Sequence, residues 1–200
     1  MSATTQLGPV ELWDSVLLEH CVIDELLSRE RHPLATVEAP DAPGVYLIFY
    51  GRPVLTSGGS AYASIQGATF PLYVGAAQNV RNRLRSHQLR VAPVKSLHGG
   101  KDLHVVTMAL PGYAEALFAE QLVRDRLRPV WNEPWCTGFG SKDQGATRRT
   151  QAPPAWSVLH PGRVEGSGEV KVTSGELSRR VKDHLAETAV VELWPSLDTP

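Results

Sequence analysis

A short stretch near the middle of the chain, YVGAAQNVRNRLRSH at 73–87, concentrates side chains that can handle a phosphate group. Arg83 and His87 are four residues apart and so share one face of a helix, and Arg81 and Arg85 pair in the same way on another face. Arginine binds phosphate through paired N–H groups, and histidine exchanges a proton near neutral pH. The stretch therefore indicates either a phosphate-handling site or a solvated basic face without chemistry.

Two tyrosines, a glutamate and an asparagine extend this set. Tyr46 lies in the apolar run 44–50, Tyr73 opens the stretch above, and Asn132 follows Glu120 by twelve residues. Hydrolysis of a phosphodiester needs a base for water, positive charge for the phosphorane and help for the leaving oxygen. These residue types supply all three. Taken singly, the tyrosines could be ordinary strand aromatics and the glutamate a solvated helix residue.

Glu115 is the rival carboxylate on the same predicted helix. It lies five residues before Glu120, which places it about 140° round the helix. The residues alone leave both carboxylates open as candidates.

Three predicted strands position the tyrosines. Runs rich in β-branched and aromatic residues predict strands at 44–50, 72–75 and 104–110. The first two would form a hairpin around a long Gly/Ser-rich loop at 51–71, which brings Tyr46 and Tyr73 onto neighbouring strands.

Four predicted helices surround these strands. Apolar residues at three-to-four spacing predict helices at 10–31, 79–88, 111–129 and 174–187. Asn79 and Ser174 are the expected N-caps. The apolar stripe of the first helix suits either core packing, which we favour, or a dimer interface. Residues 132–163 predict as neither helix nor strand, and 189–194 could add an edge strand.

Charge is unevenly distributed along the chain. Residues 44–163 carry 14 Lys or Arg and six Asp or Glu, whereas the acidic residues outnumber the basic ones before and after this segment. A basic centre between acidic ends is typical of a domain that binds a polyanion.

Composition excludes several classes of protein. No apolar run approaches the roughly 20 residues of a membrane span, and the N-terminus lacks the order of a secretory signal; we expect a cytoplasmic protein. Cys21 and Cys136 fit neither a disulfide framework nor a zinc site, and we expect both to be reduced thiols. Three histidines are expected at the surface or in loops rather than as zinc ligands: His98, His104 and His160.

The order GVY, YVG, Arg, His, Glu and Asn resembles the GIY-YIG nuclease family. Arg83 follows Tyr73 by ten residues, His87 follows Arg83 by four, and the run AEQLVRDRLRPVWN at 119–132 resembles the glutamate helix of that family. In that helix the glutamate precedes the asparagine by twelve residues, a spacing to Asn132 that only Glu120 keeps, so the resemblance selects Glu120 over Glu115. The resemblance implies an α/β chain of the α+β kind, in which a small three-stranded, mainly antiparallel sheet is flanked by helices.

The downstream segment GFGSKDQGATRRTQAPPAWSVLHPGR, 138–163, resembles a narrower group, the NgoMIII-like type II restriction endonucleases that are SacII isoschizomers. The expected organisation is an N-terminal helical extension at 1–42, a nuclease domain at 43–163 with a DNA-contacting loop at 136–163, and a C-terminal helical extension at 164–200.

The resemblance also implies a role for each site residue. Tyr46 would take a proton from the attacking water, with His87 accepting or polarising the phenol proton, because a free phenol with a pKa of about 10 is a poor base. Arg83 would bind the scissile phosphate.

The other three positions complete the implied site. Tyr73 would hydrogen-bond the phosphate or assist the leaving group, and Asn132 would support the site by hydrogen bonding. Glu120 would hold one Mg²⁺, with Mn²⁺ as a substitute, since such hard ions suit one carboxylate with phosphate and water oxygens.

Loops of the same domain would contact the DNA. Arg148, Arg149 and Arg163 could read guanine edges or anchor phosphates. Backbone contacts are expected from Lys142, Arg81 and Arg85.

The expected function is a sequence-specific type II restriction endonuclease that cuts double-stranded DNA at a G/C-rich palindrome. Such an enzyme would act as a homodimer, beside a cognate DNA methyltransferase. Two alternatives stay open: a nuclease of the same chemistry on modified, damaged or branched DNA, and a DNA-binding module without catalysis.

Overall fold

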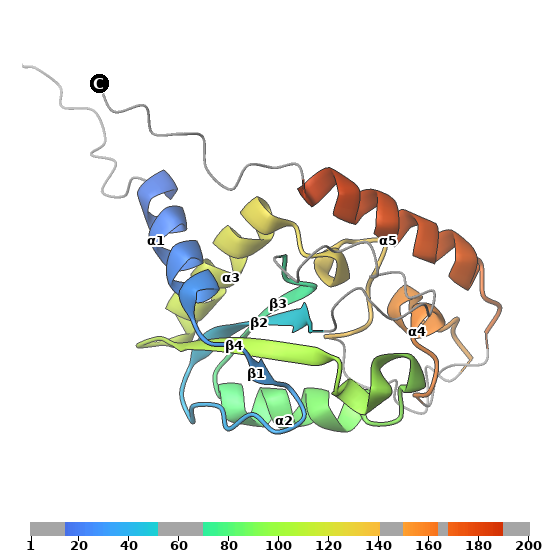
Figure 1. Cartoon of the computed structure of the whole chain (residues 1–200), viewed down its shortest axis with the longest axis horizontal. Coiled ribbons are helices and arrows are strands. Elements are labelled where there is room, and N and C mark those ends of the chain that lie inside the picture. The colour runs from blue at the N-terminus through green and yellow to red at the C-terminus, as the bar shows by residue number, and fades with distance from the viewer. Residues whose placement is uncertain (1–14, 52–69, 141–149, 164–167, 190–200) are drawn as a thin grey trace, which may run out of the picture.

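A four-stranded antiparallel sheet forms the centre of the protein (Figure 1). The structure, a computed structural model, describes residues 15–51, 70–140, 150–163 and 168–189. The strands are β1 (His32–Pro33), β2 (Gly44–Tyr50), β3 (Tyr73–Ala77) and β4 (Leu103–Ala109), in the order β1-β4-β2-β3. The three predicted strands and the β2–β3 hairpin are confirmed. The expectation of only three strands is wrong, because β1 adds a fourth with just two residues, too short to show periodicity.

Strand β2 lies between β4 and β3 and is buried on both faces. Its side chains alternate, so Tyr46 and Ile48 enter one hydrophobic cluster while Val45, Leu47 and Phe49 enter the other. This double burial explains why the strand is a continuous apolar run rather than a polar–apolar alternation.

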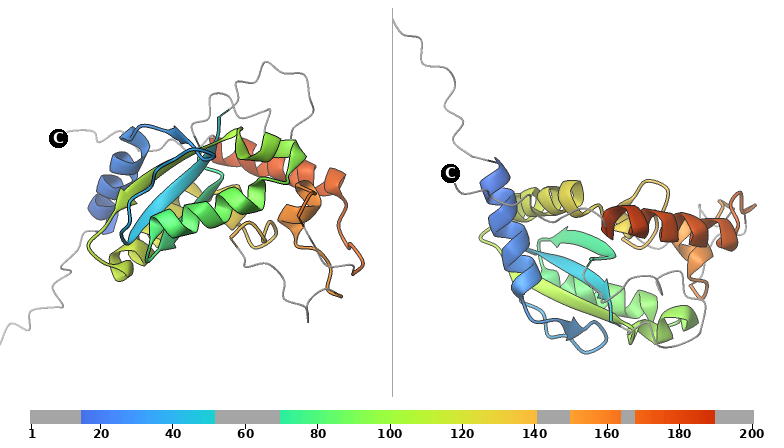
Figure 2. Two further views of the ribbon diagram at one scale, coloured as in Figure 1. Left: turned by 90° about the horizontal axis from the view of Figure 1, so that it is seen from below. Right: turned by 45° about the horizontal axis from the view of Figure 1, so that its top comes forward.

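Helices cover the two faces of the sheet (Figures 1 and 2). Helix α2 (Val80–Val91) packs Val80 and Leu84 into the cluster that holds Tyr46. On the opposite face, α1 (Ser15–Ser28) and α3 (Tyr113–Leu127) pack against Val45, Leu47 and Phe49. Ile23 and Leu26 of α1 are fully buried there, which confirms the core role favoured for this helix.

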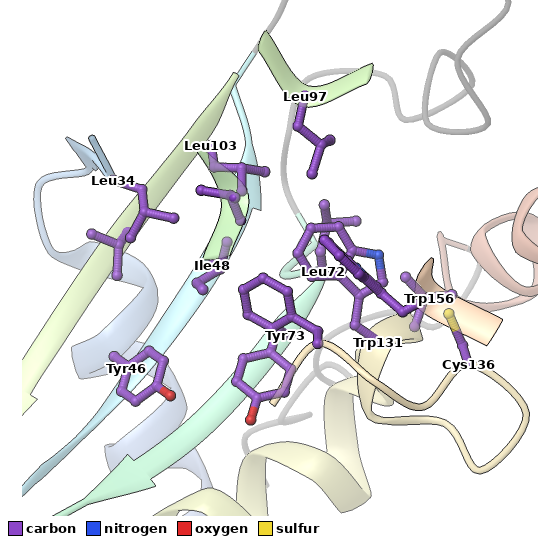
Figure 3. Packing of buried hydrophobic residues seen from close by; sticks show 14 of the residues in the cluster. Leu34, Tyr46, Ile48, Leu72, Tyr73, Leu97, Leu103, Trp131, Cys136 and Trp156 are labelled. Atoms are coloured by element: carbon purple, nitrogen blue, oxygen red, sulfur yellow. The ribbon is translucent and has the colours of Figure 1, made fainter. Parts of the chain in front are cut away.

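Two further helices extend the cluster on the Tyr46 side. Helix α4 (Ala155–Leu159) buries Trp156, and α5 (Ser174–Ala189) buries Leu177 and Val181. Figure 3 shows Trp156 beside Trp131, with Tyr46 and Tyr73 further along the same cluster. Helix α4 is absent from the sequence prediction because one turn of five residues has no readable period. Short 3-10 segments occur at Lys95–Gly100 and Val130–Asn132.

Side-chain caps define two helix starts. Asn79 caps α2 by accepting the Asn82 backbone N–H at 2.9 Å, as predicted. At α5 the Thr173 hydroxyl accepts the Glu176 N–H at 3.2 Å. The prediction of Ser174 as this cap is therefore wrong, because Ser174 is already the first helical residue.

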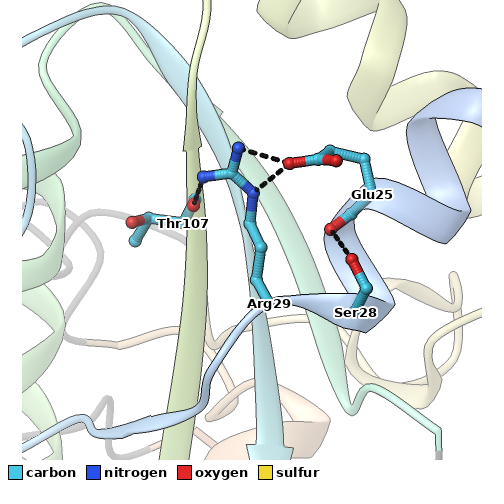
Figure 4. A network of polar contacts seen from close by, with 4 residues as sticks. All are labelled: Glu25, Ser28, Arg29 and Thr107. Atoms are coloured by element: carbon cyan, nitrogen blue, oxygen red, sulfur yellow. Dashed lines mark hydrogen bonds and ion pairs between the residues drawn. The ribbon is translucent and has the colours of Figure 1, made fainter.

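Helix α1 is tied to the sheet just beyond its last turn. Arg29 donates to the Glu25 carboxylate and, through Nη1, to the Thr107 carbonyl of β4 at 3.0 Å (Figure 4). The helix therefore ends at Ser28, three residues before the predicted end, and the chain turns into β1.

Some predictions lie partly or wholly outside the described residues. These include the greater part of the loop 51–71 and nearly all of the possible strand 189–194. Within the described chain, every helix is too short or too polar to cross a membrane. Both cysteines are free thiols, as expected, with Cys21 exposed and Cys136 buried.

Candidate active site

The outer edge of β3 organises the site. Strand β3 is an edge strand, so alternate backbone groups face away from β2 and need partners. Asn132 pairs with both the N–H and the C=O of Val74, each at 2.9 Å. Glu120 accepts the Ala76 N–H at 3.2 Å. Two predicted site residues are thus brought to neighbouring positions on this edge from α3 and the segment after it.

We expect the loss of the Asn132 side chain to weaken both fold and site. Asn132→Ala removes two hydrogen bonds and leaves Val74 with unpaired groups, so the free energy of unfolding should fall by about 2–3 kcal/mol. Urea denaturation measures this loss, and Asn82→Ala, at an exposed position, is the matched control. An unfolding free energy equal to that of the control would show that the two bonds do not hold the edge.

Gly75 makes room for the Tyr46 hydroxyl. The two residues are direct partners in the β2–β3 register. A Cβ atom on Gly75 would collide with the Tyr46 hydroxyl and ring and crowd the ring of Tyr73. The glycine of the YVG motif is therefore required by the neighbouring phenol.

Gly75→Ala should consequently damage activity by displacing the Tyr46 hydroxyl. We expect cleavage to slow by about 10²-fold, the scale of a misplacement of about 1 Å. Gly175→Ala is the control, because nothing lies within 4 Å of a Cβ there. Single-turnover cleavage of both variants decides the point: equal rates would contradict this role of Gly75.

Tyr46, His87 and Arg83 form one hydrogen-bonded group. The Tyr46 hydroxyl lies 2.8 Å from His87 Nε2, and Arg83 Nε donates to the Tyr46 oxygen at 3.3 Å. Both Tyr46 and His87 are fully buried. Since Arg83 is only a donor, the phenol accepts from Arg83 and can give its own proton to His87.

Burial sets the protonation of this group. It holds the pKa of Tyr46 well above 10, and the neighbouring Tyr73 adds to this shift while Arg83 opposes it. Burial also holds the pKa of His87 well below 6.5, with Arg83 and other arginines adding to the shift. At neutral pH the phenol is protonated and the imidazole is neutral, so His87 is ready to accept the phenol proton.

Tyr73 completes the buried group from β3. Its ring centroid lies 6.1 Å from that of Tyr46 and 5.8 Å from that of His87. Burial raises its pKa as well. Gly140 lies against its hydroxyl, and the Gly140 carbonyl accepts Arg83 Nη2 at 2.7 Å.

Glu120 is suited to hold a hard divalent ion. Its side chain is half-buried, and only Oε2 is engaged by a hydrogen bond within the described chain. No group of three or more acidic, His or Cys side chains gathers among the described residues. One carboxylate is the donor set of an ion that keeps several waters, such as Mg²⁺, and does not fit zinc.

The predicted DNA-contacting residues differ in whether other groups of the protein hold their side chains. Arg81 is held by the Ala39 carbonyl and by Asp41, whereas Arg85 is exposed and forms no hydrogen bond or ion pair with the described residues. Arg163 donates to the Gly138 carbonyl at 3.3 Å and lies over the Trp156 ring. Three others fall outside the described residues: Lys142, Arg148 and Arg149.

Among the described residues, His98, His104 and His160 belong to no group of three or more side chains that could hold a metal ion. His98 pairs with Asp102 at 2.6 Å, and His104 lies on β4. His160 lies in the loop just after the end of α4, as expected, but it is buried there, and burial lowers its pKa to about 3.

Phe139 and Gly140 contact the site although the sequence assigned them no role. Phe139 stacks on His87, and Gly140 contacts Tyr73 and Arg83. The GFG triplet at 138–140 is the only local signal, because these contacts join residues more than 50 positions apart.

Comparison with known proteins defines the class. Residues 76–185 match the sequence profile described as the Eco29kI GIY-YIG domain. That is more than half of the chain and includes four of the six site residues. No curated protein matches the chain significantly.

Among solved structures, the chain is similar to the GIY-YIG N-terminal endonuclease domain of UvrC from Thermotoga maritima. Its magnesium-bound form shares 24% identity over 56% of this chain and 97% of that chain, with a TM-score of 0.33. A point mutant of the same domain gives 24% identity, 55% and 92% coverage and a TM-score of 0.32.

The profile match, which covers more than half of the chain, therefore identifies a GIY-YIG domain. Within that class, the chain belongs to the Eco29kI GIY-YIG domain family.

Proposed function

We propose that the protein is a Mg²⁺-dependent endonuclease that hydrolyses phosphodiester bonds of double-stranded DNA. The observation that carries the proposal is the buried hydrogen-bonded group of Tyr46, His87 and Arg83 beside Glu120. A binding module has no use for a phenol that is poised to pass its proton to a neutral imidazole.

The proposed proton path begins at the attacking water. As water attacks phosphorus, Tyr46 takes its proton and transfers the phenol proton to His87 Nε2. This relay avoids a free phenolate, which burial disfavours. His87 ends the step protonated and later returns the proton to solvent or product.

Positive charge and hydrogen bonds stabilise the phosphorane. The Arg83 guanidinium offers further N–H groups to a phosphate oxygen besides those that meet Tyr46 and Gly140. The Tyr73 hydroxyl is placed to hydrogen-bond the phosphate or the leaving oxygen. A bound Mg²⁺ would be held by Glu120 and would neutralise charge on the phosphate and leaving oxygen.

Arg124 supports a DNA path beside this site. It is exposed on α3, one turn after Glu120. Arg124 and Arg128 border a polar pocket of about 300 Å³ that also touches Asn132. Asp125 and Glu133 also line this pocket, and Glu133 pairs with Arg128 at 3.6 Å, so Arg124 is the residue that we propose to bind a phosphate next to the scissile one. Arg81, Arg85, Lys142, Arg148, Arg149 and Arg163 remain the proposed contacts further along the duplex.

We further propose that the enzyme is a type II restriction endonuclease, because its family is named for Eco29kI, a restriction enzyme. The likeness of residues 138–163 to NgoMIII-like enzymes favours a G/C-rich palindrome. Cutting both strands with one site per chain calls for a homodimer, and host protection calls for a cognate methyltransferase.

A nuclease for modified, damaged or branched DNA is the second candidate. The ten-residue spacing from Tyr73 to Arg83 favours it, because the short connection between Ala77 of β3 and Val80 of α2 leaves no room for an inserted DNA-contacting segment.

The pattern of DNA fragments tests these proposals. The purified protein is incubated with an unmethylated G/C-rich plasmid and Mg²⁺, and the ends are mapped. Discrete ends at one palindrome would support a restriction enzyme. Cleavage only of plasmids that carry modified, damaged or cruciform DNA would support the second candidate, and DNA binding without any cleavage would overturn both.

A further inference from the structure

The Phe139 ring lies flat on the His87 imidazole. The two ring centroids are 4.5 Å apart and the ring planes differ by 5°. Phe139 is 1% exposed, and its other contacts are edge-on or tilted contacts with Tyr73, Trp131 and Trp156. A buried cluster of aromatic rings therefore backs one face of the imidazole.

His87 has one engaged and one unengaged ring nitrogen. Nε2 faces the Tyr46 hydroxyl, whereas Nδ1 is buried with no hydrogen-bond partner among the described residues. A metal-bound or catalytic histidine usually has its second nitrogen held by a carboxylate or carbonyl that fixes the ring. In the described part of this site no such group performs that task.

We infer that Phe139 is a positioning residue for His87: its stacked ring replaces the missing hydrogen bond, fixing the imidazole plane with Nε2 on Tyr46 and keeping water away from Nδ1. The inference rests on the proposed function for its role in catalysis, and on the stacking geometry for its role in holding the ring.

The neutral form of His87 is the form that the proton relay requires. Imidazolium would present an N–H to Tyr46 and could not accept the phenol proton. Water at Nδ1 would stabilise that charged form. The groups around the ring are Tyr46 of β2, Tyr73 of β3, Arg83 and Arg90 of α2, and Arg163. None of these groups is a carboxylate that would stabilise the imidazolium. The protonation of His87 therefore depends on whether water reaches its ring, and Phe139 limits that access.

The test compares Phe139→Leu with two controls. Trp156→Phe alters a ring that contacts Phe139, whereas the ring contacts of His87 among the described residues are with Tyr46, Tyr73 and Phe139. Phe118→Leu makes the same substitution as Phe139→Leu at a half-exposed site on α3. Circular dichroism confirms folding, and Phe139→Met replaces Phe139→Leu if the latter unfolds. Long-range ¹H–¹⁵N spectra, assigned with His87→Gln, follow the imidazole of His87 from pH 5.5 to 8.

We expect His87 of the unmodified protein and both controls to stay neutral, with the proton on Nδ1. In Phe139→Leu the ring should titrate toward the ordinary histidine pKa of about 6.5. Single-turnover cleavage of Phe139→Leu should then fall about fourfold more than that of the controls between pH 8 and pH 6, as expected for a group with that pKa.

A His87 that stays neutral in Phe139→Leu, with an unchanged pH profile, would overturn the inference. The spectra decide this without any cleavage. If the unmodified protein never cuts DNA, the proposed function fails while the effect of Phe139 on His87 is still measured separately.

Discussion

Glu120→Gln should strongly slow DNA cleavage while the protein remains folded and bound to DNA. Glutamine keeps an oxygen for the Ala76 N–H but lacks the negative charge that would hold a divalent ion beside the phosphate. We expect the single-turnover rate to fall by about 10³-fold or more, the scale on which lost electrostatic stabilisation of a transition state acts.

Glu115→Gln is the matched control for this substitution. Glu115 is an exposed carboxylate in the first turn of the same helix, so its loss should leave the rate within about twofold, as for a surface charge away from the site. A gel shift without divalent ions checks DNA binding. A Glu120→Gln protein that cuts within tenfold of the unmodified rate, or a larger loss in Glu115→Gln, would show that the wrong carboxylate has been selected.

The second large loss of cleavage activity is expected for Tyr46→Phe. The phenylalanine ring fills the same buried space, yet no hydroxyl remains to take a proton from water and pass one to His87. Loss of a general base slows cleavage by about 10²–10⁴-fold. Because Arg83 Nε and His87 Nε2 lose their partner, the free energy of unfolding should also fall by about 1–3 kcal/mol.

Tyr50→Phe tests whether this effect belongs to the hydroxyl of Tyr46. Tyr50 ends the same strand and is half-buried, so it offers the same chemical change away from the site. Rates are compared at saturating enzyme on one DNA fragment. If Tyr73→Phe lost more activity than Tyr46→Phe, the two phenols would have exchanged roles and the proton path proposed here would be wrong.

The sequence predicted the elements that carry the site better than the contacts that shape it. Strands β2, β3 and β4 and helices α2 and α3 follow from apolar patterning, and Asn79 was recognised as a cap. These features depend on residues that are near one another in the chain, and the spacing of the site residues depends on the same elements.

Other features could be recognised only in the folded structure, because they depend on residues that are far apart in the chain or on the exact backbone conformation. The two residues of β1 form a strand only because β4 pairs with them. Thr173 and Ser174 are adjacent hydroxyl residues, so either could cap α5, and only the backbone decides between them. The stacking of Phe139 on His87 joins a loop to a helix 52 positions away, which no local pattern encodes.

Gly75 could be picked out in the sequence, but its role could be understood only from the structure. The YVG motif marks the glycine, but its reason became visible only when the register placed it opposite Tyr46. From the sequence, Gly75 at the end of the predicted strand 72–75 could have served a turn. Here it provides space for a phenol from the neighbouring strand.

The metal dependence of cleavage tests the central claim most directly. Supercoiled unmethylated plasmid is incubated with the purified protein in Mg²⁺, in EDTA, and in EDTA followed by excess Mg²⁺, and cut products are followed over time. The account predicts cleavage in Mg²⁺, none in EDTA and recovery on addition of Mg²⁺. Cleavage at an equal rate in EDTA, or none under any condition with DNA still bound, would contradict it.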